Sequence, residues 1–276
     1  MKLIVVESGG SKSSWHIQNG NEYFSFQAVG LNPFELNKDK ESQLNQSLKS
    51  LSQKKGFNIY FYGSGCENSK GKENILKIFE SLGFSNSKIQ VDTDLKGACI
   101  ALLGNKNGTV GILGTGAITA LYDNDKVVKT FSGLGALLGD EGSGFDIGKR
   151  LLKAYFYNNL PKKIETEIQN YFSGHENIIP TVYSSCGRKK VAGLSKIVVE
   201  YKSDQQIKAL LCDAFTDFYK FSLKPISKNG TVSLLGSIAY YFDSEIKEVL
   251  SNHGYKVEKI IQSADKELFN YHKKKV

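Results

Sequence analysis

The sequence predicts an α/β protein of two similar lobes, each a mixed β-sheet flanked by helices, with a cleft between the lobes. Strand patterns alternate with helix patterns along the chain, as in folds that cover a sheet with helices. A strand, a glycine loop and a second strand occur over residues 5–20 and again over residues 112–124, which indicates an internal duplication. The length of 276 residues suits two moderate lobes, so we expect domains at 1–106 and 107–276.

The first lobe is expected to open with three consecutive strands. Residues 3–6 form an apolar run, residues 13–18 alternate around Trp15, and Asn19-Gly20 is a strong hairpin signal before an aromatic strand at 22–29. Apolar periodicity then predicts strands at 58–62 and 88–91 and helices at 74–82 and 94–103. An earlier, mostly polar helix is indicated by four spaced leucines, Leu36, Leu44, Leu48 and Leu51.

The second lobe repeats this opening. Strands are expected at 109–113, 118–122 and 126–131, and the glycine-dense segment 133–144 that follows is too rich in glycine for a core strand. The remaining pattern predicts helices at 145–157, 161–172, 189–201, 204–223, 238–250 and 265–272 and strands at 231–235 and 256–261. We expect the closing helix, at about 263–272, to pack back on the first lobe.

Composition and charge restrict the classes of function. The net charge is +8, but only Arg150 and Arg188 are arginines, and base reading favours arginine, so no nucleic-acid partner is expected. No run of eighteen apolar residues exists, so no membrane span is expected. The histidines show no metal-binding spacing. A cytoplasmic protein with reduced thiols is expected because the cysteines lie far apart, at Cys66, Cys99, Cys186 and Cys212.

The two glycine loops are the main candidates for chemistry. Residues 7–12 and 114–116 each join two strands, and glycine backbone in such turns forms concavities that bind anions. Neither loop is a Walker or a Rossmann loop, since a strand follows in place of the required helix. Either loop alone could be a simple tight hairpin. Two loops at matching positions in a duplicated chain favour a triphosphate held between two halves.

In this order of elements the sequence resembles the N-acetylglucosamine kinase family. The resemblance runs from Leu3 to about His272, and its most specific piece is the segment 139–144, Gly-Asp-Glu-Gly-Ser-Gly. That family belongs to the actin-like, hexokinase-like ATPase superfamily, whose lobes are ribonuclease H-like. Its larger grouping includes the activators of 2-hydroxyglutaryl-CoA dehydratase. The resemblance implies ATP-dependent phosphorylation of an amino sugar, with N-acetylglucosamine and its C6 hydroxyl expected, and a homodimer is implied by the resemblance only.

The resemblance also assigns residues. Asp94 is implied as the general base, and Glu7 as the residue that orients hydrated Mg²⁺ through water. ATP is expected on Glu7, Ser8, Gly9, Gly10, Ser11, Lys12, Gly114, Thr115, Gly116, Gly236 and Ser237. The small-molecule sugar is expected on Asn32, Ser64, Gly65, Asp94, Gly133, Asp140 and Gly144.

Alternatives remain open from the residues alone. Asp94 suits a helix N-cap, Asn32 before a proline suits a turn, and Asp140 suits a charged helix start. Relatives usually carry Asp where Glu7 stands, and the extra methylene moves the charge by roughly 1.5 Å. A non-catalytic nucleotide or sugar sensor is therefore a second hypothesis. A dehydratase-activator ATPase would need a cysteine-bound iron–sulfur cluster, and neither Cys66 nor Cys99 has a neighbouring cysteine in the sequence.

Overall fold

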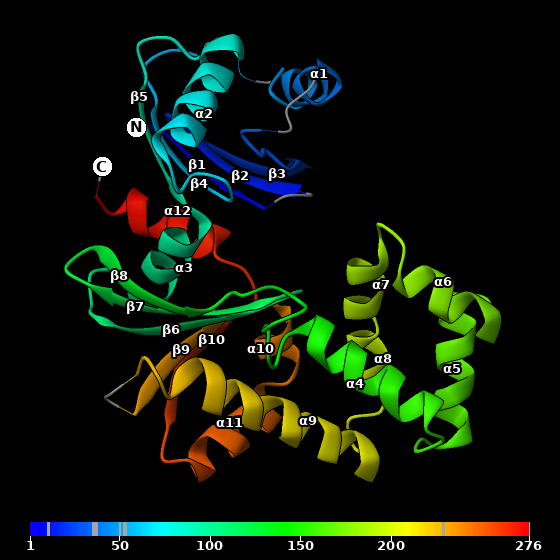
Figure 1. Ribbon diagram of the computed structural model, residues 1–276. Helices are drawn as coiled ribbons and strands as arrows, with labels where there is room; N and C mark the ends of the chain where they lie inside the picture. The colour runs from blue at the N-terminus through cyan, green and yellow to red at the C-terminus, as the bar shows by residue number, and fades with distance from the viewer. Residues whose placement is uncertain (10–11, 35–37, 50, 52–53, 228–229, 276) are drawn as a thin grey trace. The chain divides into compact units, whose positions relative to one another are not determined.

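The computed structural model describes residues 1–9, 12–34, 38–49, 51, 54–227 and 230–275. The chain divides into two compact units (Figure 1). Unit 1 consists of Met1–Asn105 and Ser263–Val276, and unit 2 of Lys106–Gln262. The expected residues Gly10 and Ser11 of the first glycine loop, and Leu36 of the expected first helix, lie outside the described residues.

Unit 1 is built on a mixed sheet with the strand order β3-β2-β1-β4-β5 in the described part of the chain. Strands β1, β2 and β3 form an antiparallel meander, and β4 and β5 continue the sheet in parallel with β1. The expected strands are all present. They span Lys2–Ser8 (β1), Lys12–Asn19 (β2), Glu22–Val29 (β3), Asn58–Gly63 (β4) and Lys88–Thr93 (β5).

Helices cover both faces of this sheet. Alternate strand residues such as Ile4, Trp15 and Phe61 form one core with the helices α1 (Lys38–Ser47) and α2 (Ser69–Ser81). The opposite face lies against α3 (Asp94–Leu103) and α12 (Asp265–Lys273), where the Tyr62 hydroxyl lies 2.8 Å from Nε2 of His272. Helix α2 begins five residues before the expected start because Asn68 caps its polar first turn, accepting a hydrogen bond from the Gly71 N–H.

Unit 2 repeats the sheet of unit 1. Its order, read from the antiparallel side, is β8-β7-β6-β9-β10, with β6, β7 and β8 as the meander and β9 and β10 parallel to β6. The same order with the same directions in both units confirms the duplicated α/β fold. The strands span Gly108–Leu113 (β6), Ala117–Asp123 (β7), Lys126–Ser132 (β8), Thr231–Leu235 (β9) and Lys256–Ile261 (β10).

A helical region is inserted between β8 and β9 of unit 2 (Figure 1). Its core joins apolar side chains of the sheet, such as Leu113 and Leu234, to the helices. The helices of unit 2 are α4 (Gly144–Phe156), α5 (Lys162–Phe172), the short η1 (His175–Asn177), α6 (Ile178–Val182), α7 (Gly187–Gly193), α8 (Ser195–Glu200), α9 (Gln205–Phe218), the π-helix η2 (Tyr219–Leu223), α10 (Ser237–Tyr241) and α11 (Asp243–Asn252).

Two expected helices are each divided into two. The helix expected at 189–201 is interrupted at Leu194, where the Tyr171 hydroxyl donates to the carbonyl of Lys190 and approaches the backbone of Gly193. The helix expected at 238–250 is interrupted at Phe242, whose fully buried ring packs near Phe215. In both places tertiary packing overrides a continuous helical pattern. Among the described residues, no helix is long and apolar enough to cross a membrane.

Candidate active site

In unit 1 the predicted site residues lie at the carboxyl ends of three parallel strands. Ser8 of β1 is aligned with Gly63 of β4, and Gly63 is aligned with Thr93 of β5. The residues that follow these strand ends therefore leave the sheet at one edge. The carboxyl edge of parallel strands is where open α/β sheets bind ligands.

The Ser8 side chain connects the loops at this edge. Its buried Oγ accepts a hydrogen bond of 2.8 Å from the Leu31 N–H, and its carbonyl accepts one of 3.2 Å from the Ser64 N–H. Gly65 has a φ of +83°, and a Cβ there would lie 3.0 Å from the Pro33 ring. Oδ1 of Asn32 accepts from the Phe34 N–H, which is the turn that its place before a proline suggested. The structure thus brings Asn32, Ser64 and Gly65 into one loop cluster.

Asp94 stands at the first position of α3, and its neighbour Thr93 is the N-cap. Oγ1 of Thr93 accepts from the Lys96 N–H at 3.1 Å, while Oδ1 of Asp94 accepts from the Leu95 N–H at 2.8 Å. Burial is the largest effect on Asp94 and raises its pKa, and the negative charge of Glu67 raises it further. Two backbone hydrogen bonds to the carboxylate act to lower the pKa, but the net effect is an increase. The N-cap role is therefore filled by Thr93, and the Asp94 carboxylate is a stronger base than an exposed aspartate.

Glu7, the last-but-one residue of β1, is a partly buried acid with a strongly raised pKa. Burial, and after it the negative charges of Asp265 and Asp94, raise its pKa to about 7, while Lys12 acts to lower it. The backbone of Glu7 pairs with β2 and β4, but among the described residues its carboxylate has no hydrogen bond or ion pair. Unbalanced negative charge in a half-buried place fits a cation, and Mg²⁺ commonly uses only one or two carboxylates and keeps its water ligands. The described residues include no group of three or more His, Cys, Asp or Glu suited to direct metal coordination.

This perturbation predicts a pH-dependent stability of the protein without nucleotide or metal. Because the pKa of Glu7 is raised from 4.5 to about 7 in the folded state, the folded chain binds more protons than the unfolded chain between these pH values. Its free energy of unfolding therefore falls as pH rises through this window, by up to about 3 kcal/mol. Glu7→Gln removes the titration, so the variant gains stability relative to the wild type between pH 5 and pH 8.

Urea unfolding at pH 5 and pH 8 measures this gain, with Glu22→Gln at the exposed start of β3 as the matched control. A stability difference between Glu7→Gln and the wild type that is the same at both pH values would contradict the pKa argument.

In unit 2 the second glycine hairpin, residues 114–116, lies between β6 and β7. The Gly114 N–H donates to the Gly116 carbonyl at 2.9 Å, which closes the turn. The carbonyl of Gly114 accepts from the Gly144 N–H at 2.8 Å, and that of Thr115 accepts from the Phe145 N–H at 3.2 Å. The start of α4 thus fixes the hairpin. Among the described residues, the N–H groups of Thr115 and Gly116 have no partner, so they are available to an anion.

Gly236 follows β9 and lies against the base of this hairpin. Its φ is +119°, and a Cβ at this position would lie 2.2 Å from the carbonyl oxygen of Leu113. No other residue fits such an approach of backbone to backbone. The consequence is that Ser237, the next residue, starts α10 directly beside the hairpin.

A cavity of about 570 Å³ opens at this point. A smaller cavity of about 340 Å³ shares Ser195, Lys196, Ser237 and Ile238 with it and extends toward α8 and α10. Three lysines are among the lining residues, so the cavity combines apolar walls with positive charge, as a nucleotide requires. The larger cavity is lined by Gly114, Thr115, Gly144, Tyr171, Cys186, Lys189, Lys190, Ala192, Gly193, Ser195, Lys196, Ser237 and Ile238.

Three of the residues expected at the sugar, Gly133, Asp140 and Gly144, lie in unit 2. The only polar side chain among these three is that of Asp140, and it is buried. Asp140 is buried, with Oδ1 accepting from the Ala117 N–H at 3.1 Å and Oδ2 from Nη2 of Arg188 at 2.9 Å. Gly133, with a φ of +73°, packs against Ile118. Gly144 lines the cavity together with Gly114. A sugar-binding role for these residues stays a prediction, and the contact that the structure shows for Asp140 is with the second hairpin.

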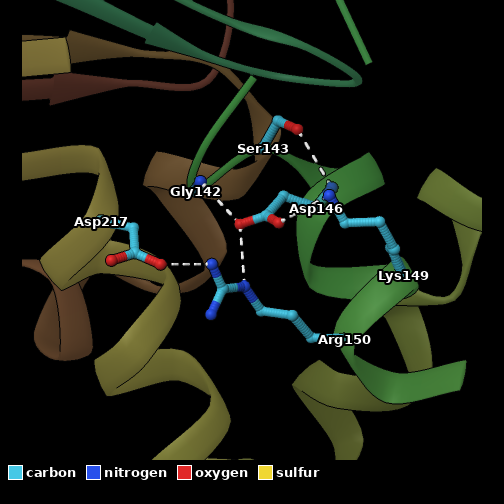
Figure 2. Close-up of polar contacts among 6 residues, drawn as sticks. All are labelled: Gly142, Ser143, Asp146, Lys149, Arg150 and Asp217. Atoms are coloured by element: carbon cyan, nitrogen blue, oxygen red, sulfur yellow. Dashed lines mark hydrogen bonds and ion pairs between the residues drawn. The ribbon is translucent and has the colours of Figure 1, made fainter. Parts of the chain in front are cut away.

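An ion-pair network holds the glycine segment before α4 in place (Figure 2). Oδ2 of Asp146 accepts from the Gly142 N–H at 3.1 Å and from Nε of Arg150 at 3.0 Å. Nη2 of Arg150 donates to Asp217 of α9 at 2.6 Å. The Ser143 hydroxyl caps the helix by accepting from the Asp146 N–H. The network therefore ties the segment that contacts the second hairpin to two long helices.

Sequence reasoning missed the wall that α7 gives to the cavity. Cys186, Lys189 and Lys190 line it, and the sequence signal was a short basic run, Arg-Lys-Lys at 188–190. The sequence pattern assigned Lys189 and Lys190 only to the start of the helix expected at 189–201. The packing of α7 on α4 brings this basic run beside the glycine hairpin, which lies more than seventy residues earlier in the chain. Such a long-range contact leaves no signal in the local sequence.

Cys186 offers a direct test of the cavity. Both Cys186 and Cys212 are exposed, but only Cys186 lines the cavity. Nucleotide at about ten times its Kd is expected to slow alkylation of Cys186 by iodoacetamide by about tenfold, because occupied protein is shielded. Peptide mass spectrometry with and without Mg-ADP measures both thiols, and Cys212 on α9 is the internal control. Equal protection of both cysteines, or of neither, would contradict a nucleotide in this cavity.

The chain is similar in sequence and in fold to known sugar kinases. No family model matches the chain. It is 26% identical over 239 residues, 79% of this chain and 78% of the relative, to the N-acetylmuramic acid/N-acetylglucosamine kinase of Clostridium acetobutylicum. A provisionally named N-acetylglucosamine kinase from Porphyromonas gingivalis superimposes with a TM-score of 0.87, at 25% identity over 98% of each chain. A ROK family glucokinase from Streptomyces griseus, solved with glucose and AMPPNP, has the same fold with a TM-score of 0.59, at 11% identity over 98% of each chain.

These likenesses agree with the two matching five-stranded sheets. They confirm the resemblance, the fold class and the enzyme class that the sequence predicted. The chain is a relative of the N-acetylglucosamine kinases with the duplicated actin-like fold, and it is a sugar kinase.

Proposed function

We propose that the protein transfers the γ-phosphoryl group of ATP to a hydroxyl group of an amino sugar, with N-acetylglucosamine as substrate and C6 as the site of transfer. Two observations, each within one unit, carry the proposal: unit 2 has a lysine-lined cavity at a glycine hairpin, and unit 1 has a partly buried Asp94 with a raised pKa at its strand ends. The names of the Clostridium acetobutylicum and Porphyromonas gingivalis proteins support this substrate class.

Unit 2 supplies the nucleotide site in this proposal. The adenosine part of ATP occupies the cavity beside Gly236 and Ser237. The lysines of α7 and α8 lie near the phosphates of ATP. The unpartnered N–H groups of Thr115 and Gly116 donate to phosphate oxygens. Such fixed donors stabilise the charge that develops during phosphoryl transfer.

Unit 1 supplies the base and the sugar loops. Asn32, Ser64 and Gly65 lie together on loops that Ser8 connects, and they position the sugar. Asp94 accepts the proton of the attacking hydroxyl as the bond to phosphorus forms and the bond between the γ-phosphorus and the bridging oxygen of ADP breaks. Glu7, through water, and Lys12 would face the metal and the phosphates, and Mg²⁺, when bound, supplies neutralisation of phosphate charge.

Release of ADP over a panel of sugars tests this function. The panel comprises N-acetylglucosamine, glucosamine, N-acetylmuramic acid and glucose, each with Mg-ATP and each against a no-sugar blank. We expect sugar-dependent ADP release, highest with an N-acetylated amino sugar. Release that is equal with and without sugar would contradict the proposal.

A second function, a sensor that binds nucleotide and sugar without turnover, is favoured by one observation. Both oxygens of Asp140, the residue expected at the sugar, are occupied by Ala117 and Arg188. Calorimetry separates the two functions on the same panel. Sugar binding with no ADP release supports the sensor, and binding with release supports the kinase.

A further inference from the structure

Arg188 lies beside the second glycine hairpin and belongs to none of the residues assigned above to nucleotide or sugar. It is the second residue of α7, the helix that lines the nucleotide cavity. A Cβ built on Gly116 would lie 2.9 Å from Nη2 of Arg188 and 2.9 Å from Oδ2 of Asp140. The guanidinium group is therefore in contact with the backbone of the hairpin.

A buried carboxylate holds this guanidinium in place. Oδ2 of Asp140 accepts from Nη2 of Arg188 at 2.9 Å, and Oδ1 of the same carboxylate accepts from the Ala117 N–H. Asp140 has a side chain only 3% exposed and adopts a φ of +62°, an unusual conformation for a residue other than glycine. Two hydrogen bonds from different elements to one buried carboxylate fix the position of Arg188 relative to the hairpin.

Most of the donors of Arg188 are unused. Its side chain is 53% exposed, and among the described residues the bond to Asp140 takes only one of its five N–H donors. Arg150, the other arginine of the chain, donates through Nε and Nη2 to Asp146 and Asp217. The planar fork of an arginine matches the oxygens of a phosphate group.

Resting on the proposed function, we propose that Arg188 is a further catalytic residue, which binds the γ-phosphoryl group of ATP during transfer while Asp140 positions it. Its charge offsets the negative charge that spreads over the phosphoryl oxygens as the group moves from ADP to the sugar oxygen. The hairpin N–H groups and Arg188 then contact the same phosphate from the same side of unit 2.

The test compares two nucleotides that differ by the γ-phosphate. Calorimetry in the presence of Mg²⁺, without sugar, gives Kd for AMPPNP and for ADP. In Arg188→Met we expect Kd for AMPPNP to rise about tenfold more than Kd for ADP, and kcat to fall by about 10²–10³. Arg188→Lys, which keeps the charge without the fork, is expected to lie between Arg188→Met and the wild type.

Two further variants keep the result interpretable. Arg188→Met leaves Asp140 buried without its cation, so the double variant Arg188→Met/Asp140→Asn is measured as well, and it should show the same selective loss of AMPPNP binding. Lys189→Met, which changes the next residue of α7, is the control, and we expect it to weaken both nucleotides to the same extent.

The outcomes separate this proposal from the proposed function. Equal loss for AMPPNP and ADP in the Arg188 variants overturns the role of Arg188, whatever the kinase activity. A selective loss of turnover with N-acetylmuramic acid, and not with N-acetylglucosamine, also overturns it, because Arg188 then contacts a sugar carboxylate. If the wild type binds AMPPNP and ADP but phosphorylates no sugar, the proposed function fails while the ratio of Kd values still tests Arg188. If it binds neither nucleotide, both proposals fail.

Discussion

Asp94→Asn is expected to lower kcat by about 10²–10⁴ with little change in stability. The asparagine keeps an oxygen that can accept from the Leu95 N–H, and Thr93 remains the N-cap of α3, so the helix start is preserved. What is lost is the group that accepts the proton of the sugar hydroxyl. Initial rates of ADP formation at saturating ATP and sugar, together with urea unfolding, measure both effects.

Thr93→Ala is the matched control for this variant. It removes the cap hydrogen bond to the Lys96 N–H and should cost about 1 kcal/mol of stability. It leaves the carboxylate of Asp94 in the chain, so its loss of turnover should be far smaller. Unchanged turnover in Asp94→Asn, or a loss no greater than that of Thr93→Ala, would remove Asp94 from the mechanism.

Arg150→Met is expected to destabilise the protein by about 3 kcal/mol. Asp146 is 4% exposed, and without Arg150 its charge keeps only the Gly142 N–H and Lys149, whose Nζ is 3.4 Å from Oδ1 (Figure 2). Breaking a buried ion pair by removing one partner leaves an uncompensated charge, which is strongly unfavourable. The midpoint of urea unfolding measures the loss.

Two comparisons define this prediction further. Lys162→Met removes an ion pair with Glu165. Because the Lys162 side chain is 88% exposed, the loss of this pair should lower the free energy of unfolding by less than about 1 kcal/mol. The double variant Arg150→Met/Asp146→Asn removes the orphan charge and should recover part of the loss. Equal losses in Arg150→Met and Lys162→Met would show that the network contributes no more than a surface pair.

Local signals in the sequence are enough to predict the strands and the internal duplication, whereas the actin-like fold class follows from the family resemblance. The hairpin at Asn19-Gly20, the apolar strands and the repeated glycine loop each depend on neighbours close in the chain, and the structure shows the strands at these positions. The helix breaks at Leu194 and Phe242 could not be predicted, because they depend on Tyr171 and on the burial of an aromatic ring against a distant helix.

The site could be predicted only in part, for the same physical reason. Glycines 114 and 236 are visible as turn residues, but their contact depends on β6 and β9 pairing as neighbours across more than a hundred residues. Asp140 and Arg188 are far apart in sequence, and their ion pair arises from the packing of α7 on α4. Burial is the main cause of the raised pKa of Glu7, and Asp265 of the closing helix α12 adds to it. Charges that shift one another through space leave no trace in local patterns.

The position of the phosphate on the product distinguishes a sugar kinase from an ATPase and from a sensor. The purified protein is incubated with Mg-ATP and N-acetylglucosamine, and the mixture is followed by phosphorus NMR with proton coupling. We expect a new phosphomonoester signal that is coupled to the two protons on C6 of the sugar and grows as ADP forms. Formation of inorganic phosphate and ADP alone, or no change in ATP while nucleotide and sugar both bind, would contradict it.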